Sequence, residues 1–81
     1  MNVTNITADE VLDTCGLACP MPLLKTKKTL KKMSAGKILE IQGNDPGSKN
    51  DIPEWGNKGG NQFLGMTDID NGVTRYFIQK G

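Results

Sequence analysis

The residues with the clearest chemical potential are Cys19 and the prolines beside it, in the order Cys19-Pro20-Met21-Pro22. Proline is favoured in the first turn of a helix, because its missing N–H would be unpaired there and its φ is already helical. This spacing predicts that a helix begins at Pro20 and that Cys19 occupies the cap. A sulfur at the cap faces free amides and the positive end of the helix dipole, which favour the thiolate. We therefore expect Cys19 to be nucleophilic near neutral pH.

A run of lysines follows the thiol on the same predicted helix. No Asp or Glu occurs between Thr14 and Leu39, so the local field also favours an anionic sulfur, although salt weakens it with distance. A charged helix face is commonly just a solvated one, whereas a basic patch beside a reactive thiol steers an acidic partner protein. Both interpretations apply to Lys25, Lys27, Lys28, Lys31 and Lys32.

The two cysteines each have a second interpretation. An isolated cysteine is often only a small buried apolar residue, but the prolines and lysines around Cys19 favour a reactive thiol. Cys15 is either a resolving thiol that attacks an oxidised Cys19 or a buried residue at the end of the first strand. We favour the buried role and leave Cys15 out of the catalytic set, since a disulfide needs Cα atoms about 4.4–6.8 Å apart in a suitable orientation.

Composition excludes several classes of protein. The chain of 81 residues has 10 Lys and Arg, 9 Asp and Glu, and no His. A net charge near zero disfavours a general nucleic-acid binder. Two cysteines without histidine are too few for a four-ligand zinc site or a disulfide scaffold, and we expect no metal or organic cofactor. A self-contained Cys-His catalyst is excluded, because it needs an imidazole.

Length and hydropathy bound the organisation of the chain. A sequence this short predicts one domain over residues 1–81, with a single core. The N-terminal stretch includes Asp9, Glu10 and Asp13 and has no apolar run of signal-peptide length. No run of about eighteen apolar residues occurs anywhere. We predict a cytoplasmic protein that does not contact a membrane.

The predicted helix over residues 20–33 is amphipathic. One side of it forms a buried stripe at helical spacing, made of Leu23, Thr26, Leu30 and Met33. Met21 and Leu24 fall outside this stripe, within about one turn of Cys19. They either form an exposed apolar rim beside the sulfur or are covered by the preceding loop.

The remaining elements follow from turn signals and alternation. A first short strand covers 11–13, and a second strand at 37–41 follows Gly36, which suits a left-handed helix cap. Ser48 is expected to cap a second helix that stops at 59–60, where Pro53 fits only if the helix begins late or is irregular. Strands at 62–69 and 73–79 are joined by the hairpin turn Asp70-Asn71-Gly72.

This order, β-α-β-α-β-β, predicts the fold class. Single helices between strands, followed by a hairpin, suit an α/β (α+β) two-layer sandwich with a four-stranded mixed sheet and two helices on one face. The first two strands should be parallel, because a helix connects them.

The segment Asp13-Thr14-Cys15-Gly16-Leu17-Ala18-Cys19-Pro20-Met21-Pro22 resembles the signature of the TusA/SirA-like sulfur carriers, small proteins with a C-P-x-P motif. The resemblance covers nearly the whole chain. It continues at Lys27-Lys28, 38–42, 45–46, Asp51-Ile52-Pro53-Glu54-Trp55 and 76–78. Two departures stand out: Gly60-Asn61-Gln62 replaces a glycine-histidine pair of many relatives, and the position of Cys15 is often not cysteine.

The resemblance implies a function as well as the same fold. Cys19 matches the cysteine that carries sulfur as a persulfide, received from a desulfurase or rhodanese-like donor and passed to an acceptor protein. The acceptor belongs to tRNA 2-thiouridine synthesis or to dissimilatory sulfur metabolism. Such a protein is a relay rather than a self-contained catalyst, and we expect it to be a monomer when free, with no cofactor and no direct contact with nucleic acid.

Two other functions compete with this one. The basic helix over 20–33 would suit a small regulatory RNA-binding module, whose bases would stack on Trp55, Phe63, Tyr76 or Phe77. Cys15 and Cys19 together would suit a thiol redox enzyme, but their spacing is not the C-x-x-C of thioredoxin-like motifs.

Overall fold

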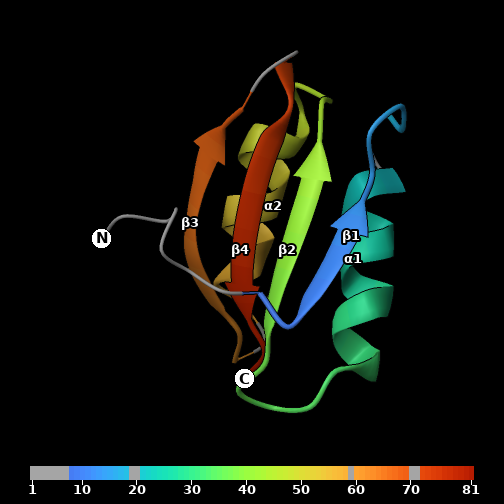
Figure 1. Cartoon of the computed structure of the whole chain (residues 1–81). Coiled ribbons are helices and arrows are strands. Elements are labelled where there is room, and N and C mark those ends of the chain that lie inside the picture. The colour runs from blue at the N-terminus through green and yellow to red at the C-terminus, as the bar shows by residue number, and fades with distance from the viewer. Residues whose placement is uncertain (1–7, 19–20, 59, 70–71) are drawn as a thin grey trace.

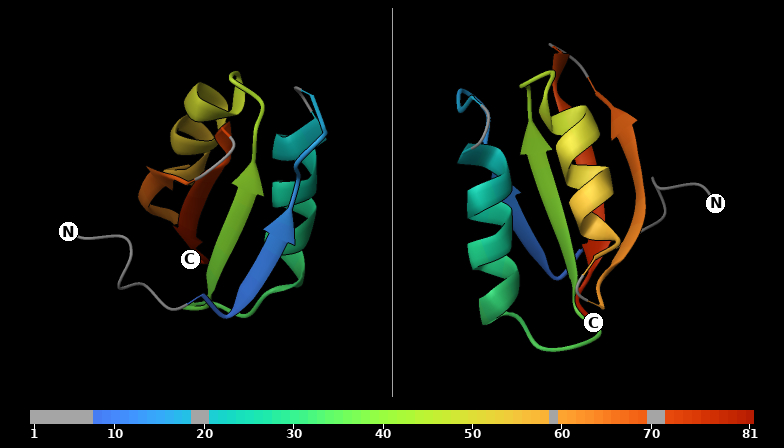
Figure 2. Two further views of the ribbon diagram at one scale, coloured as in Figure 1. Left: turned by 45° about the horizontal axis from the view of Figure 1, so that its top comes forward. Right: turned by 180° about the vertical axis from the view of Figure 1, so that it is seen from behind.

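The computed structural model describes residues 8–18, 21–58, 60–69 and 72–81. The elements follow the predicted order: β1 (Glu10–Asp13), α1 (Met21–Lys32), β2 (Ile38–Gly43), α2 (Ser48–Gly56), β3 (Gln62–Asp68) and β4 (Thr74–Gln79). The strands form one sheet in the order β1-β2-β4-β3 (Figure 1). Both helices lie on the same face of this sheet (Figure 2). The predicted two-layer α+β sandwich is confirmed.

The pairing of β1 with β2 determines where the segment before Cys19 begins. β1 is parallel to β2, whereas β4 is antiparallel to both β2 and β3. The carboxyl ends of two parallel strands meet at the same edge of a sheet. The residues after β1 therefore lie beside the residues after β2, at the top of Figure 1.

The core lies between the sheet and the two helices. It is formed by fully buried side chains from four elements: Leu30, Leu39, Ile41, Ile52, Tyr76 and Ile78. In the register of β2 with β4, Leu39 is opposite Ile78 and Ile41 is opposite Tyr76. Alternate residues of a strand share a face, so these four point toward the helices. Burial of each such side chain contributes about 1.5–3 kcal/mol.

α1 has the predicted buried stripe. Thr26 and Leu30 are buried, and Leu23 and Met33 are half-buried against the core. The hydroxyl of Thr26 donates a hydrogen bond to the Pro22 carbonyl at 2.8 Å, which explains how a polar side chain is accommodated there.

The predicted helix cap at Gly36 is wrong, although the residue does adopt a positive φ of 89°. α1 ends at Lys32, and the amide of Met33 bonds back to the Leu30 carbonyl at 3.1 Å. Such a bond over three residues tightens the last turn and ends the helix early. Gly36 instead lies in the turn that leads to β2, where the amide of Lys37 bonds to the Ser34 carbonyl at 3.2 Å.

The start predicted for α2 is also wrong. Gly47 is the N-cap and no side chain caps the helix, while Ser48 is its first residue and donates its hydroxyl to Asp45 Oδ2 at 3.4 Å. The first turn is irregular, as Pro53 requires, because the amide of Asn50 bonds to the Gly47 carbonyl three residues back. The helix ends at Gly56, where a Cβ would lie 3.2 Å from side chains of β3 and β4.

The C-terminal hairpin is confirmed, with each strand one residue shorter than predicted. The amide of Ile69 bonds to the Val73 carbonyl at 2.7 Å, and Gly72 has a φ of 73°. A positive φ at this position is what an Asn-Gly turn provides. Asp70 and Asn71 lie outside the described residues.

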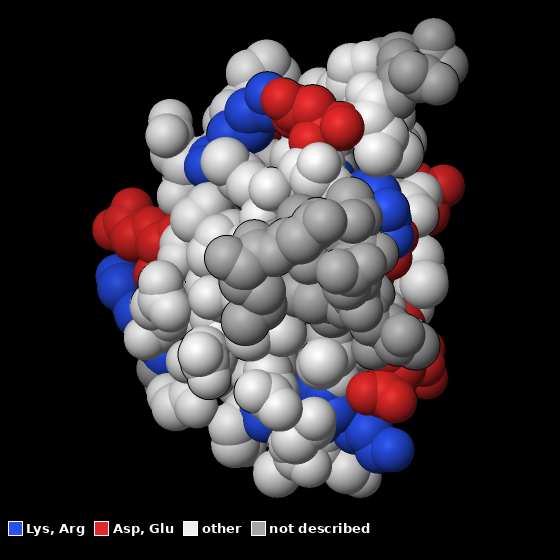
Figure 3. All heavy atoms as spheres, turned by 60° about the vertical axis from the view of Figure 1, so that its left-hand side comes forward, with Lys and Arg blue, Asp and Glu red and all other residues white. Residues whose placement is uncertain are grey.

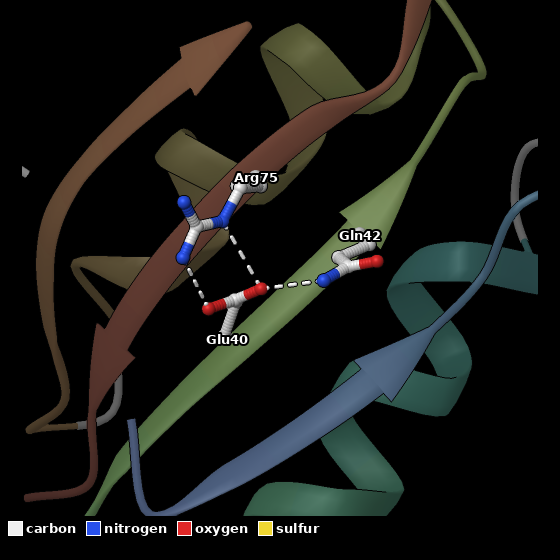
Figure 4. A network of polar contacts seen from close by, with 3 residues as sticks. All are labelled: Glu40, Gln42 and Arg75. Atoms are coloured by element: carbon white, nitrogen blue, oxygen red, sulfur yellow. Dashed lines mark hydrogen bonds and ion pairs between the residues drawn. The ribbon is translucent and has the colours of Figure 1, made fainter. Parts of the chain in front are cut away.

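The face of the sheet opposite the helices carries a network of three polar residues (Figure 4). The carboxylate of Glu40 accepts hydrogen bonds from Arg75 Nε at 3.1 Å, Arg75 Nη2 at 2.8 Å and Gln42 Nε2 at 2.6 Å. The hydrogen bond from Arg75 holds the pKa of Glu40 below its ordinary value. This bidentate pair joins β2 to β4 across a face that no helix of Figure 2 covers.

Candidate functional site

Cys19 and Pro20 lie outside the described residues, so the helix-cap position of Cys19 stays a prediction. The structure describes the chain on both sides of them. The amide of Met21 bonds to the Ala18 carbonyl at 2.9 Å, which closes a turn at the start of α1. The candidate site is therefore approached through the loop of residues 14–18 and the first turn of α1.

Thr14 fastens the beginning of this loop to β2. Its amide and its hydroxyl both donate to the Gln42 carbonyl, at 2.6 and 2.8 Å. The side chain is only 1% exposed. A buried hydroxyl that lost its acceptor would carry a desolvation cost of about 1–3 kcal/mol, so this contact is a firm one.

A second contact holds the middle of the loop. The side chain of Asn44, directly after β2, accepts a hydrogen bond from the amide of Gly16 at 3.1 Å. Gly16 has a φ of 86°, a conformation that side chains rarely adopt. The amide of Leu17 then bonds to the Thr14 carbonyl at 3.1 Å. Sequence analysis missed the roles of Thr14 and Asn44, because only the pairing of β1 with β2 brings them together.

Cys15 is exposed, so the prediction that it is buried at the end of the first strand is wrong. β1 ends at Asp13, and the amide of Cys15 bonds to the Asp13 carboxylate at 2.9 Å. Partial desolvation and the neighbouring Asp13 carboxylate raise the pKa of the Cys15 thiol. Cys15 is therefore a protonated, weakly nucleophilic thiol at neutral pH, the opposite of the state expected for Cys19.

α1 presents a surface that is both apolar and basic. Pro22 lies in the first turn, as predicted, and is buried. Met21 and Leu24 are 44% and 49% exposed, which favours the exposed rim over the covered alternative. Around them are four exposed lysines, Lys25, Lys28, Lys31 and Lys32.

Lys27 differs from the other lysines of α1. It is half-buried, and its Nζ lies 5.6 Å from the centre of the Trp55 ring on α2. A cation over an aromatic face at this distance is stabilising by about 0.5–1 kcal/mol. Lys27 therefore has a structural role between the helices.

Other parts of the surface differ from α1. On the side where β3 comes forward, basic and acidic side chains lie next to one another (Figure 3). The largest hollow, ≈ 330 Å³, is lined by residues that include Asp9, Lys32 and Lys37. These lie at the far end of α1 from the loop, so chemistry at the loop takes place on an open surface.

The aromatic residues are poorly placed for stacking on RNA bases. Tyr76 and Phe77 are fully buried, and Phe63 and Trp55 pack against the core. Single-stranded nucleic acids bind to exposed aromatic faces. This arrangement disfavours the RNA-binding alternative.

Two searches of the described residues concern metals and membranes. In residues 8–18, 21–58, 60–69 and 72–81, no group of three His, Cys, Asp or Glu side chains is arranged to hold a metal ion. Within that same part of the chain, no helix has the length and apolar character needed to cross a membrane.

Comparison with known proteins agrees with the geometry. The chain is 45% identical over 74 residues to "Putative sulfur carrier protein YrkI" of Bacillus subtilis, which covers 91% of this chain and 97% of the relative. It is 38% identical over 72 residues to the sulfur carrier protein TusA of Allochromatium vinosum, covering 89% and 93%. Two longer relatives also match, and the chain spans 38% of the length of each.

A solved structure and a family profile extend this result. The crystal structure of the SirA-like protein of Desulfitobacterium hafniense has a TM-score of 0.78 and 26% identity, covering 89% of this chain and 97% of that one. The profile of the family described as Sulfurtransferase TusA matches residues 10–80, from the first strand to the residue after the last. This chain belongs to the TusA family.

Proposed function

We propose that this protein is a single-domain sulfur carrier in which Cys19 accepts sulfane sulfur as a persulfide and passes it to an acceptor protein. The observation that carries the proposal is the Cys19-Pro20-Met21-Pro22 motif between β1 and α1, in a chain of the TusA family. The donor would be a desulfurase or rhodanese-like protein. The carrier would work in the cytoplasm, as a monomer when free, and as a relay rather than a self-contained catalyst.

The surroundings of the motif suit a thiolate. The first turn of α1 contains no acidic residue, and four exposed lysines follow it on the same helix. Positive charge and the amino end of a helix both lower the pKa of a cysteine. Cys15 is the contrasting case, because the Asp13 carboxylate beside it contributes to a raised thiol pKa.

The transfer step is balanced without a cofactor. The Cys19 thiolate attacks the outer sulfur of a cysteine persulfide on the donor. A sulfur–sulfur bond forms at Cys19 Sγ while the bond inside the donor persulfide breaks, and its electron pair leaves on the donor thiolate. The persulfide proton stays with the transferred sulfur. One thiolate and one persulfide thus yield one persulfide and one thiolate, with no external oxidant or reductant.

Intact-mass spectrometry tests this proposal. The purified protein would be incubated with a cysteine desulfurase and cysteine, next to the Cys19→Ser and Cys15→Ser variants. We expect a gain of one sulfur, about 32 Da, in the wild type and in Cys15→Ser, and none in Cys19→Ser, since the thiolate is the sulfur acceptor. Absence of the gain in all three proteins, or an equal gain in both variants, would contradict it.

The acceptor pathway requires a separate experiment. We propose delivery to an acceptor protein of tRNA 2-thiouridine synthesis or of dissimilatory sulfur metabolism. Mass spectrometry of tRNA nucleosides from a strain lacking this gene distinguishes the two routes. Loss of 2-thiouridine that the wild-type gene restores and Cys19→Ser does not would assign the tRNA route. Unchanged tRNA together with impaired sulfur oxidation would assign the other.

A further inference from the structure

The loop before Cys19 is held by side chains outside the sheet ladder. Thr14 donates twice to the Gln42 carbonyl, and Asn44 accepts from the amide of Gly16. These contacts join residues 28 positions apart in the sequence. They act at the edge of the sheet where the carboxyl ends of β1 and β2 meet.

Gly43 makes room for this arrangement. A Cβ built on Gly43 would lie 2.6 Å from Thr14 Oγ1, far closer than two such atoms can approach. The Thr14 hydroxyl is buried and hydrogen-bonded, so it has no free space into which it can move. The absence of a side chain at Gly43 is thus matched to the presence of one at Thr14.

We propose that Thr14 and Asn44 are positioning residues for Cys19. They hold the backbone from Thr14 to Ala18 in one conformation, and through it they orient the thiol relative to the start of α1. This inference rests on the proposed function of Cys19 as the sulfur acceptor. It assigns a role to two residues that lie outside the Cys19-Pro20-Met21-Pro22 motif.

The physical reason is the short range of helix-end electrostatics. The stabilisation of an anion by free amides and the dipole falls off within the first turn, so a small displacement of the sulfur removes much of it. A loop with several alternative conformations would hold the thiol near the helix for only part of the time. Two side-chain anchors reduce that loss, because they restrict the backbone before sulfur transfer begins.

Alkylation kinetics test the proposal without any partner protein. In the Cys15→Ser background, Cys19 is the only thiol, and its rate of reaction with iodoacetamide is measured from pH 5 to 10. We expect Thr14→Val and Asn44→Ala to slow alkylation at pH 7 by about three- to tenfold and to move the midpoint to higher pH, because the thiolate is less favoured. Thr14→Ser, which keeps the hydroxyl, should restore the original profile.

Asn57→Ala is the matched control, since Asn57 is another exposed asparagine whose Oδ1 accepts a backbone amide, that of Phe63, at 3.2 Å. It should leave the alkylation profile unchanged. Profiles of Thr14→Val and Asn44→Ala that coincide with the control, in proteins whose circular dichroism shows a native fold, would overturn the proposal. Since alkylation needs no sulfur donor, this outcome is separable from a failure of persulfide loading in the mass experiment.

Gly43→Ala provides an independent route to the same contact. In the presence of Thr14 it should displace the hydroxyl and shift the alkylation profile in the same direction. Combined with Thr14→Ala, it should add nothing to the effect of Thr14→Ala alone, because the clash is gone. Shifts that add fully would show that the two residues do not act through one contact.

Discussion

The two helices pack on the same face of the sheet but present opposite surfaces to solvent. α1 has five lysines, no acidic residue and two apolar side chains, Met21 and Leu24, that are nearly half exposed. α2 alternates charges of both signs, including Lys49, Asp51 and Glu54. Both helices still bury fully one large side chain in the common core, Leu30 from α1 and Ile52 from α2. The buried stripes therefore account for the fold, and the outer surface of α1 distinguishes the functional helix.

The starts of the two helices differ in the same way. α2 begins at Gly47 without a side-chain cap. The loop leading to α1 is held by Thr14 and by Asn44, and the amide of Met21 closes a turn onto Ala18. A solvent-exposed helix start without a side-chain cap is tolerated, because water satisfies its amides. The molecule places its specific contacts at the helix start that carries the reactive cysteine.

The largest expected effect would test whether α2 is purely structural. Ile52→Ala removes a side chain with no exposed surface, and we expect it to lower the free energy of unfolding by about 3 kcal/mol through lost burial and a cavity. Urea denaturation measures this change. The alkylation rate of Cys19 in the folded variant should stay at the wild-type value. A slower Cys19 at equal folded fraction would show that α2 also supports the site.

The Glu40–Arg75 pair on the opposite face should support both helices equally. Glu40→Gln breaks a charged, bidentate contact of a buried carboxylate, and we expect a loss of about 2 kcal/mol in urea denaturation at pH 7. The alkylation profile of Cys19 should not change. A selective effect on the loop would contradict this view of the pair.

Acid provides a second measurement on the same pair. The pKa of Glu40 is lowered in the folded state, so its contribution is complete above the unfolded value of about 4.3 and is lost as pH falls through the folded value. We expect wild-type stability to decline below about pH 4.3, and the decline in Glu40→Gln to be smaller. Equal declines in the two proteins would mean that other carboxylates account for the acid sensitivity.

A smaller effect is expected from the charge of α1. Lys25→Glu combined with Lys28→Glu should slow sulfur loading from an acidic donor by about tenfold at low salt, because the attraction that steers the encounter is lost. The matched control is Lys49→Glu with Lys58→Glu, two lysines at and beyond α2. Loading rates would be followed by mass spectrometry at several salt concentrations. Equal effects of the two pairs, or no salt dependence, would argue that the lysines only solvate the helix.

The smallest effect on stability is expected at the apolar rim. Leu24→Ser should change the free energy of unfolding by less than about 0.5 kcal/mol, since the side chain is 49% exposed. Sulfur loading should nevertheless slow by about threefold if a partner covers this position. Val11→Ser, at a residue that is 59% exposed on β1, is the control and should load normally.

Much of the fold followed from local sequence rules. The prolines and the helical stripe predicted α1, alternation and the Asn-Gly turn predicted the C-terminal hairpin, and together they predicted the order of elements. Errors occurred where elements begin and end, at Gly36 and at Ser48. Helix ends depend on which carbonyl an amide reaches, as with Met33 and Leu30, and neighbouring residue types do not determine that choice.

The sequence by itself determined the reactive motif, the element order and the resemblance to the TusA family, because these depend on residues within a few positions of one another. Only the tertiary structure decided that Cys15 is exposed and that Thr14 and Asn44 hold the loop before Cys19. The physical reason is that those contacts cross between strands 28 residues apart. Their partners are selected by the register of β1 against β2, which depends on packing of the whole sheet rather than on local propensity.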